Sequence, residues 1–115
     1  MDNFYAEKRT HKRLEFANSL QYIKLDANTR ERVEAMIKDI SREGISFFTN
    51  EFISLATRLV LTIRLPRYPR PIKVISKVIW IRKDSKTDRF ELGNQFVEMI
   101  KEDQKLFEQY LGEAV

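Results

Sequence analysis

Cysteine is absent from this sequence of 115 residues, and histidine occurs once, at His11. Without cysteine the chain has no disulfide, no thiolate nucleophile and no sulfur ligand for zinc. One histidine is too few for a multi-histidine metal site or for the usual nucleophile–base pairs. The three glycines are not spaced as a phosphate-binding loop. We therefore predict a protein that is not an enzyme and that holds no metal or cofactor.

Long hydrophobic runs are also missing. Leu59 to Leu61 is among the longest apolar runs and is far too short to cross a bilayer. The first eight residues lack the apolar stretch of a signal peptide. With 43% hydrophobic and 33% charged residues, the composition is that of a globular chain with one core. We expect one domain, located in the cytoplasm, with no membrane insertion.

Charge is distributed unevenly along the chain, although the net charge is only +4. Residues 52–83 carry eight Arg or Lys and no acid, whereas residues 84–115 carry eight acids and four bases. A basic stretch attracts phosphate groups. Its lysines and arginines equally suit a solvated strand surface, where long cationic side chains cover apolar neighbours.

Alternation of apolar and polar residues predicts mainly β structure. Strand patterns occur at residues 20–25, 32–40, 45–48, 58–65, 72–80 and 89–99. Turn signals separate them, including Arg42-Glu43-Gly44 and the cluster of Pro66, Pro69 and Pro71. This spacing is typical of a compact antiparallel meander or barrel. We interpret Trp80 and most phenylalanines as core residues.

The two ends of the chain differ from this pattern. Apolar residues at helical spacing predict a helix over about residues 100–112, with Ile100, Phe107 and Tyr110 on the face that caps the sheet. The first dozen residues are polar and charged. We expect residues 1–13 to form a flexible N-terminal arm and residues 14–115 to form the folded domain.

Two short motifs combine with this pattern. The first is Arg9-Thr10-His11-Lys12-Arg13, before the first predicted strand, and the second is Asp39-Ile40-Ser41-Arg42-Glu43-Gly44, at the end of the second. They resemble the RxxxR and [D/N]xSxxG motifs of PilZ domains. The similarity continues through the strand order, the segment Gly93 to Val97 and the final helix. It therefore covers about residues 8–111.

The resemblance implies a six-stranded antiparallel β-barrel that binds the bacterial second messenger cyclic di-GMP on its outer surface, with the arm folding over the ligand. It assigns Arg9 and Arg13 to the guanine edge and the phosphates. An arginine can pair with guanine O6 and N7, stack on a base or hold a phosphate. Lys8 and Lys12 would add supporting charge.

The second motif supplies the other predicted contacts. Asp39 and Ser41 are two residues apart, so in an extended segment both side chains face one ligand base. A carboxylate there accepts hydrogen bonds from guanine N1–H and N2. We expect Gly44 to occupy a tight turn with positive φ or to let the backbone approach the ligand. Arg42 and Gly93 are predicted secondary contacts.

Other interpretations use the same residues. Arg9 and Arg13 also fit a solvated basic arm, and Asp39 and Ser41 also fit a turn that closes a hairpin. A ligand-independent PilZ-like adaptor is one alternative function, disfavoured because all the motif residues are present. A small nucleic-acid-binding barrel is a weaker one, prompted by the acid-free stretch.

The preferred hypothesis is a stand-alone cyclic di-GMP receptor. Ligand binding would order the arm and create a surface that a separate effector protein recognises. The output would be motility, biofilm formation or exopolysaccharide production. The sequence leaves open the effector, the oligomeric state, and whether one ligand or a stacked pair of ligands binds.

Overall fold

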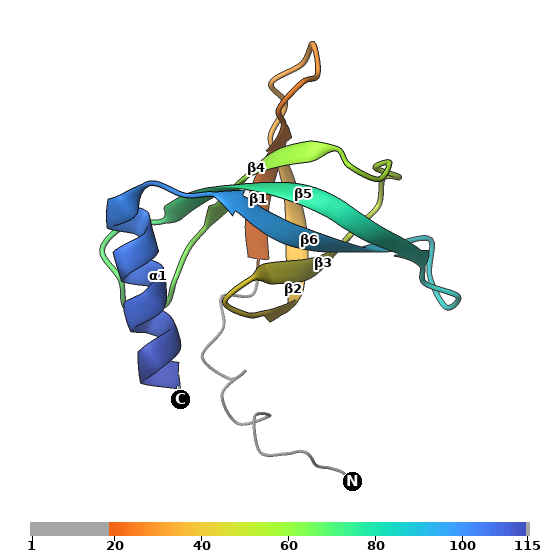
Figure 1. Ribbon diagram of the computed structural model, residues 1–115. Coiled ribbons are helices and arrows are strands. Elements are labelled where there is room, and N and C mark those ends of the chain that lie inside the picture. The colour runs from red at the N-terminus through yellow and green to blue at the C-terminus, as the bar shows by residue number, and fades with distance from the viewer. Residues whose placement is uncertain (1–18, 115) are drawn as a thin grey trace, which may run out of the picture.

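The computed structural model describes residues 19–114. The predicted arm, residues 1–13, lies outside them. Six strands are followed by one helix (Figure 1). They are β1 (Ser19–Lys24), β2 (Val33–Ile40), β3 (Gly44–Thr49), β4 (Arg58–Ile63), β5 (Ile72–Lys83), β6 (Phe90–Glu98) and α1 (Lys101–Ala114).

The strands close into a barrel in the order β1-β2-β3-β6-β5-β4, and every neighbouring pair is antiparallel. The predicted six-stranded antiparallel barrel is therefore confirmed. Strand β5 is twice as long as β4, with 12 residues against 6. Its first half pairs with β4 as far as Lys77, and its second half continues along β6 to Lys83. In Figure 1, β4 runs along the upper side of the barrel and β3 along the lower side, while β2 descends from the β1–β2 hairpin at the top.

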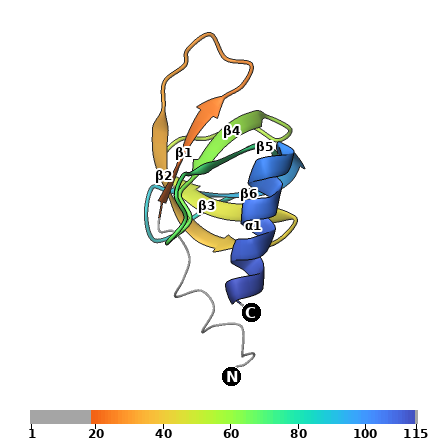
Figure 2. The same cartoon turned by 90° about the vertical axis from the view of Figure 1, so that its left-hand side faces the viewer.

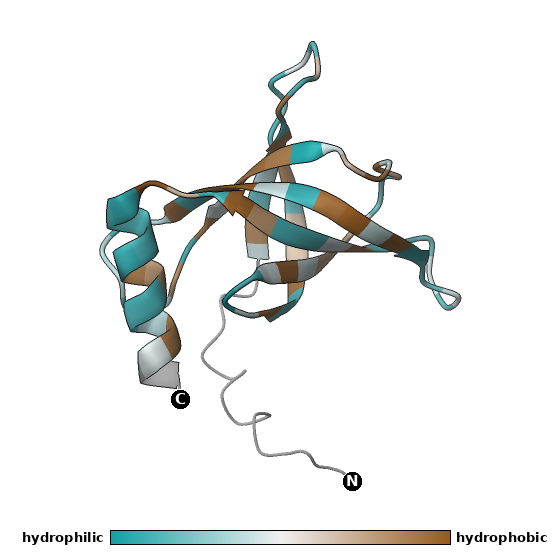
Figure 3. Cartoon of the chain, in the orientation of Figure 1, coloured by the Kyte–Doolittle hydropathy of each residue, from teal (hydrophilic) through white to brown (hydrophobic). Residues whose placement is uncertain are grey.

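Alternating side chains fill the barrel, as strand geometry requires. On β4, Leu59, Leu61 and Ile63 are fully buried and point inward. Figure 3 shows the resulting bands of hydrophobic and hydrophilic residues along the strands. Polar pairs also lie inside, and in one of them Ser76 Oγ donates a hydrogen bond to Asn94 Oδ1 at 3.1 Å. This bond satisfies the buried hydroxyl, which would otherwise be costly to bury.

Three register shifts interrupt this alternation: one lies between Ile75 and Ser76 on β5, and the other two are bulges on neighbouring parts of the sheet. The β2–β3 register shifts between Ile37 and Asp39, and the β5–β6 register shifts between Val78 and Trp80. A bulge inserts one extra residue and so reverses the inward and outward order beyond it. Val78 is buried, but Trp80 pairs with Gly93 on the outer surface and is 39% exposed. The sequence interpretation of Trp80 as a core residue was wrong for this reason.

Helix α1 packs across one end of the barrel (Figure 2). Phe107 and Tyr110 are buried in the core, while Asp103 accepts hydrogen bonds from Arg70 and, at 2.9 Å, from the backbone N–H of Lys73. The helix prediction is confirmed, except that Ile100 precedes the helix and is 61% exposed. Among residues 19–114, α1 is too short and too polar to span a bilayer.

Candidate functional site: an outer groove of the barrel

A groove of about 480 Å³ lies on the outer surface where β2, β3 and β6 meet the second half of β5. We call it the outer groove. Both extra residues of the bulges described above, Lys38 and Ile79, line it. Its other lining residues are Asp39, Ser41, Glu43, Gly44, Ile45, Ser46, Trp80, Arg82, Glu91, Gly93, Asn94 and Gln95.

The second sequence motif forms one rim of this groove. Asp39 Oδ1 accepts a hydrogen bond from Ser46 Oγ on β3 at 3.0 Å. This contact fixes the carboxylate and leaves Oδ2 without a partner among the described residues. Ser41 closes the turn into β3: its N–H donates to Gly44 O at 2.8 Å, and its hydroxyl donates to the same oxygen at 3.4 Å. Asp39 is thus held by a neighbouring strand, not by the turn.

The positive φ predicted as one reason for Gly44 is not present, while the predicted close approach to the ligand stays a prediction. No described glycine has positive φ, so a left-handed turn does not explain this residue. A Cβ atom at position 44 would instead overlap the backbone oxygen of Asn94 on β6. Gly44 is therefore required for close packing of β3 against β6, and this requirement is structural.

Trp80 and Gly93 form the opposite wall of the groove. A Cβ atom at position 93 would overlap the indole ring of Trp80, so the ring lies directly over this glycine. The guanidinium carbon of Arg82 is 5.4 Å from the centroid of the indole. A cation at this distance is attracted by the ring face. The glycine, the bulge and the arginine together hold an aromatic surface at the groove.

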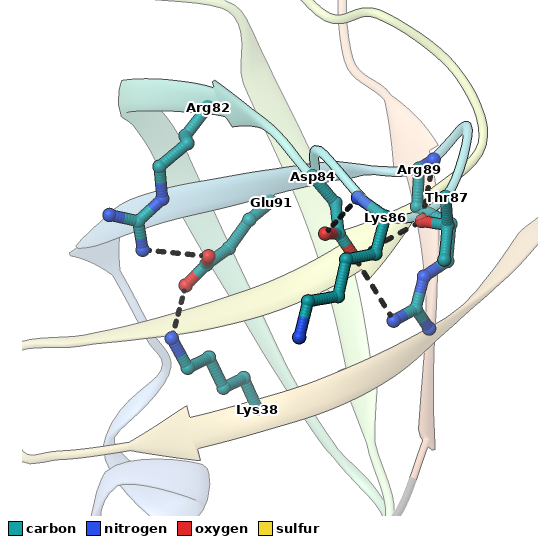
Figure 4. A network of polar contacts seen from close by, with 7 residues as sticks. All are labelled: Lys38, Arg82, Asp84, Lys86, Thr87, Arg89 and Glu91. Atoms are coloured by element: carbon teal, nitrogen blue, oxygen red, sulfur yellow. Dashed lines mark hydrogen bonds and ion pairs between the residues drawn. The ribbon is translucent and has the colours of Figure 1, made fainter.

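A charged cluster lies beside this wall (Figure 4). Glu91 Oε2 accepts a hydrogen bond from Lys38 at 2.8 Å, and Oε1 accepts one from Arg82 at 2.8 Å. Burial raises the pKa of Glu91, but the hydrogen bonds from Lys38 and Arg82 outweigh it, so the pKa is lowered. At neutral pH the carboxylate is ionised and the cluster has one net positive charge.

A second network shapes the β5–β6 hairpin next to this cluster (Figure 4). Asp84 accepts hydrogen bonds from the backbone N–H of Lys86 and from the Thr87 hydroxyl, both at 3.1 Å, and lies 3.6 Å from Arg89. These contacts, the Lys86 N–H first, lower the pKa of Asp84. They fix the turn that connects the two strands of the groove wall.

The structure brings together four of the residues that the sequence singles out: Asp39, Ser41, Gly44 and Gly93. Arg42 points elsewhere and lines a separate groove of about 370 Å³ between β6 and α1. The remaining predicted contacts are in the first eighteen residues, outside the described part of the chain: Lys8, Arg9, Lys12 and Arg13.

The groove residues that supply its charged cluster and its aromatic wall were not predicted from the sequence; they are Lys38, Trp80, Arg82 and Glu91. The bulges at Lys38 and Ile79 explain why these residues were not predicted. A bulge shifts the alternation of a strand by one residue, so the residues beyond it face the other surface of the sheet. The only available signal was the pattern Trp80-Ile81-Arg82, which places an aromatic and a cation on the same side of a strand.

Metal binding has no support in the described residues. Within residues 19–114 there is no group of three His, Cys, Asp or Glu side chains that could hold an ion. The chemistry available in the outer groove is hydrogen bonding through Asp39 and Ser41, stacking on Trp80, and charge pairing through Lys38 and Arg82.

Solved structures with the same fold place this barrel in context. MotI/DgrA of Bacillus subtilis, an inhibitor of motility, aligns with a TM-score of 0.66 and 24% identity over 84% of this chain and 45% of that one. MrkH of K. pneumonia in its apo state aligns with a TM-score of 0.63 and 20% identity, over 84% of this chain and 46% of that one. PlzA of Borreliella burgdorferi in complex with c-di-GMP aligns with a TM-score of 0.57 and 17% identity, over 88% of this chain and 36% of that one. This chain spans less than half the length of each, and the similarity shows the fold.

The sequence itself matches the model of the PilZ domain over residues 7–113. No curated relative matches the chain. Members of this domain family are cyclic di-GMP receptors rather than enzymes, in agreement with the prediction that this chain is not an enzyme. The match includes both sequence motifs and the whole barrel, so the chain belongs to the PilZ domain family.

Proposed function

We propose that this protein is a cyclic di-GMP receptor and that the ligand binds in the outer groove. The observation that carries the proposal is the meeting of Asp39, near the end of β2, and Ser41, in the β2–β3 turn, with the exposed ring of Trp80 in one groove. A guanine needs hydrogen-bond partners at its edge and a flat surface against its face. These three side chains offer both.

Asp39 is suited to the guanine edge. Its Oδ1 is occupied by Ser46, so the geometry of the carboxylate is set before ligand arrives. Its open Oδ2 can accept a hydrogen bond from guanine N1–H or N2. Adenine has no N1–H donor, so this contact favours guanine. Ser41 Oγ, with only a long contact to Gly44, adds a second hydrogen-bonding group.

Trp80 is suited to the guanine face. Stacking of a base on an aromatic side chain contributes about 1–3 kcal/mol. The Trp80 ring lies over Gly93 and is still 39% exposed to solvent. The ring is also adjacent to Arg82. One base stacked on Trp80 would therefore place its neighbouring phosphate within the field of the positive cluster of Lys38, Arg82 and Glu91.

Arg9 and Arg13 complete the proposed site. Cyclic di-GMP carries two phosphates, and the groove offers only two cations, Lys38 and Arg82. Three acids also line it, namely Asp39, Glu43 and Glu91. Further cations are needed, and the RxxxR motif supplies them, with Lys8 and Lys12 in support. Ordering of residues 1–13 over the ligand would couple binding to a change of surface, which a separate effector could recognise. Among structural neighbours MotI/DgrA is an inhibitor of motility, and we propose an output of this kind, in motility, biofilm formation or exopolysaccharide production.

Calorimetric titration with cyclic di-GMP tests the proposal, with GTP and cyclic di-AMP as controls. Trp80 is the only tryptophan, so its fluorescence reports directly on the groove in the same samples. We expect selective binding with one or two ligands per chain and a change in Trp80 emission. Binding without any change in Trp80 emission would indicate that the ligand binds outside the groove. No binding at tens of micromolar protein would favour a ligand-independent adaptor.

Two substitutions sharpen the test. Arg13→Ala should weaken binding about ten- to a hundredfold, because charged hydrogen bonds contribute about 1.5–3 kcal/mol. Asp39→Ala should weaken binding of cyclic di-GMP and reduce the preference over cyclic di-AMP. Asp88→Ala, an exposed acid in the β5–β6 turn, is the matched control and should bind like the wild type. Wild-type affinity in both Arg13→Ala and Asp39→Ala would refute this site.

A further inference from the structure

The side of the barrel away from the outer groove has a surface of its own, formed by the outward residues of β1, β4 and the first half of β5. Four cations lie on it or at its edge: Arg58, Arg64, Lys73 and Lys77. The half-buried side chains of Ile23, Val60 and Ile75 lie side by side across its centre, because each pairs with the next in the register of the sheet. We call this surface the basic face.

The register places the cations on both sides of the aliphatic centre. Arg58 pairs with Lys77 on one side of Val60 and Ile75, and Lys73 pairs with Thr62 on the other. Lys73 and Lys77 are four positions apart, a distance of about 13 Å along β5. An apolar strip is thus flanked at either end by positive charge, over a span that corresponds to two or three turns of a helix.

None of the four cations forms an ion pair with a described residue. The nearest acids on neighbouring strands are Glu98, which pairs with Ile75 in the β5–β6 register, and Glu34, which bonds Ser19. Arg58 and Lys77 lie directly opposite each other on adjacent strands. Like charges in this arrangement are destabilising. No ion pair with a residue of the range 19–114 offsets this repulsion between Arg58 and Lys77.

We propose that the basic face is the docking surface for an acidic segment of a separate protein, in which carboxylates flank aliphatic side chains. Protein interfaces combine an apolar centre with a polar rim, which is the arrangement seen here. Opposite charge on the partner would remove the repulsion between Arg58 and Lys77 and would speed and orient association. The proposal rests on the proposed function to the extent that a receptor without catalytic groups needs a partner.

Three other occupants fit the surface less well. Single-stranded nucleic acid is held by aromatic side chains among the cations, and the outward positions of these three strand segments carry none. Residues 1–18 of the same chain carry four cations and three acids, so they have the wrong sign. The acidic helix α1 of a second copy would make a heterologous contact, which propagates into filaments unless it closes into a ring.

A designed peptide tests the proposal. It is a helical 20-mer with Glu at two positions eight residues apart and Leu midway between them, and its matched control has Gln in place of Glu. Each is titrated into the ¹⁵N-labelled full chain, with and without saturating cyclic di-GMP. We expect shifts of backbone resonances confined to β1, β4 and residues 72–77 with the Glu peptide, and none with the Gln peptide.

Variants distinguish the basic face from the rest of the surface. The double substitution Arg58→Glu with Lys77→Glu should weaken peptide binding about tenfold or more, whereas Lys86→Glu, in the distant β5–β6 turn, should not. The neutral pair Arg58→Gln with Lys77→Gln should give an intermediate loss. All of these variants should bind cyclic di-GMP like the wild type, as monitored by Trp80 emission, so failure of one proposal is separable from failure of the other.

Several results would overturn the inference. These are the absence of shifts up to millimolar peptide, or shifts centred on the outer groove. Tighter binding of this face to a 20-nucleotide single strand, or to vesicles of equimolar phosphatidylcholine and phosphatidylglycerol, would replace the protein partner with nucleic acid or membrane. Concentration-dependent shifts of α1 and β4 without any peptide would identify a second copy as the occupant.

Discussion

The outer groove and the basic face are both rich in cations, but they treat these charges in opposite ways. In the groove, Lys38 and Arg82 are each hydrogen-bonded to Glu91 at 2.8 Å. On the basic face, Arg58 and Lys77 face each other with no carboxylate between them. Fixed charges suit a small ligand, which needs groups in place before it arrives. Unpaired charges suit a larger partner that brings its own counter-charge.

A single strand belongs to both surfaces. The first half of β5 contributes Lys73, Ile75 and Lys77 to the basic face, and the second half contributes Trp80 and Arg82 to the groove. The bulge at Ile79 lies between these halves. A shift of β5 on ligand binding would therefore reach both surfaces through continuous backbone, which makes β5 the natural element to examine for coupling.

The largest effect on stability is expected from Gly44→Ala, at the junction of β3 and β6. This substitution tests whether Gly44 is needed for packing or only for a ligand contact. The added methyl group would overlap the Asn94 carbonyl, so we expect a loss of roughly 2–3 kcal/mol in the free energy of unfolding. Urea denaturation measures it. Gly112→Ala, with open space around the new atom, is the control and should not destabilise the protein. Equal stability of Gly44→Ala and wild type would contradict the packing role and would favour a ligand contact as the reason for Gly44.

Trp80→Ala should affect the groove alone. We expect a loss of about 1–3 kcal/mol in cyclic di-GMP binding from the missing stacking surface, with little change in the melting temperature because the ring is exposed. Calorimetry measures the affinity, and Trp80→Phe should restore part of it. Lys77→Ala, on the basic face, should leave the affinity unchanged. If Trp80→Ala also bound normally, the aromatic wall would have no part in recognition.

Replacing a lysine by glutamate should change the free energy of unfolding in opposite directions on the two surfaces. Lys38→Glu places a second carboxylate beside Glu91 and should cost about 1 kcal/mol of stability. Lys77→Glu places a carboxylate opposite Arg58 and should add about 0.5 kcal/mol. Thermal unfolding at low and high salt measures both, and the difference should shrink as salt rises. Destabilisation by both substitutions would mean that the basic face carries no repulsion.

The smallest expected effect is the dependence of stability on pH through Glu91. The pKa of Glu91 is lowered in the folded chain, so its contribution to stability is complete above the pKa of an unfolded glutamate. That contribution is lost as the pH falls through the lowered folded value. Stability should therefore decrease on acidification, and less steeply in Glu91→Gln. Urea denaturation from pH 7 to pH 3.5 compares the two proteins. Parallel curves would show that the cluster does not hold the carboxylate ionised.

The sequence predicted the barrel because alternation is a local property, and each strand was located to within three residues at either end. Trp80 was misplaced because a bulge depends on the partner strand and leaves no mark in the alternation of its own strand. The packing role of Gly44 was missed for a similar reason: its neighbour in space, Asn94, is fifty residues away in the chain. The motif located Asp39 and Ser41, whereas the Glu91 cluster depends on the register of three strands.

Closure of the barrel has a consequence for how this protein can recruit other proteins. Because each strand of residues 19–114 has a hydrogen-bonded neighbour on both sides over at least part of its length, none offers a full-length free edge to which a partner could add a strand. Recognition through side chains on the outer surface is therefore favoured, and side chains can be exchanged one at a time without disturbing the backbone. The same scaffold can thus acquire a new partner on one face while the ligand site on the other is retained.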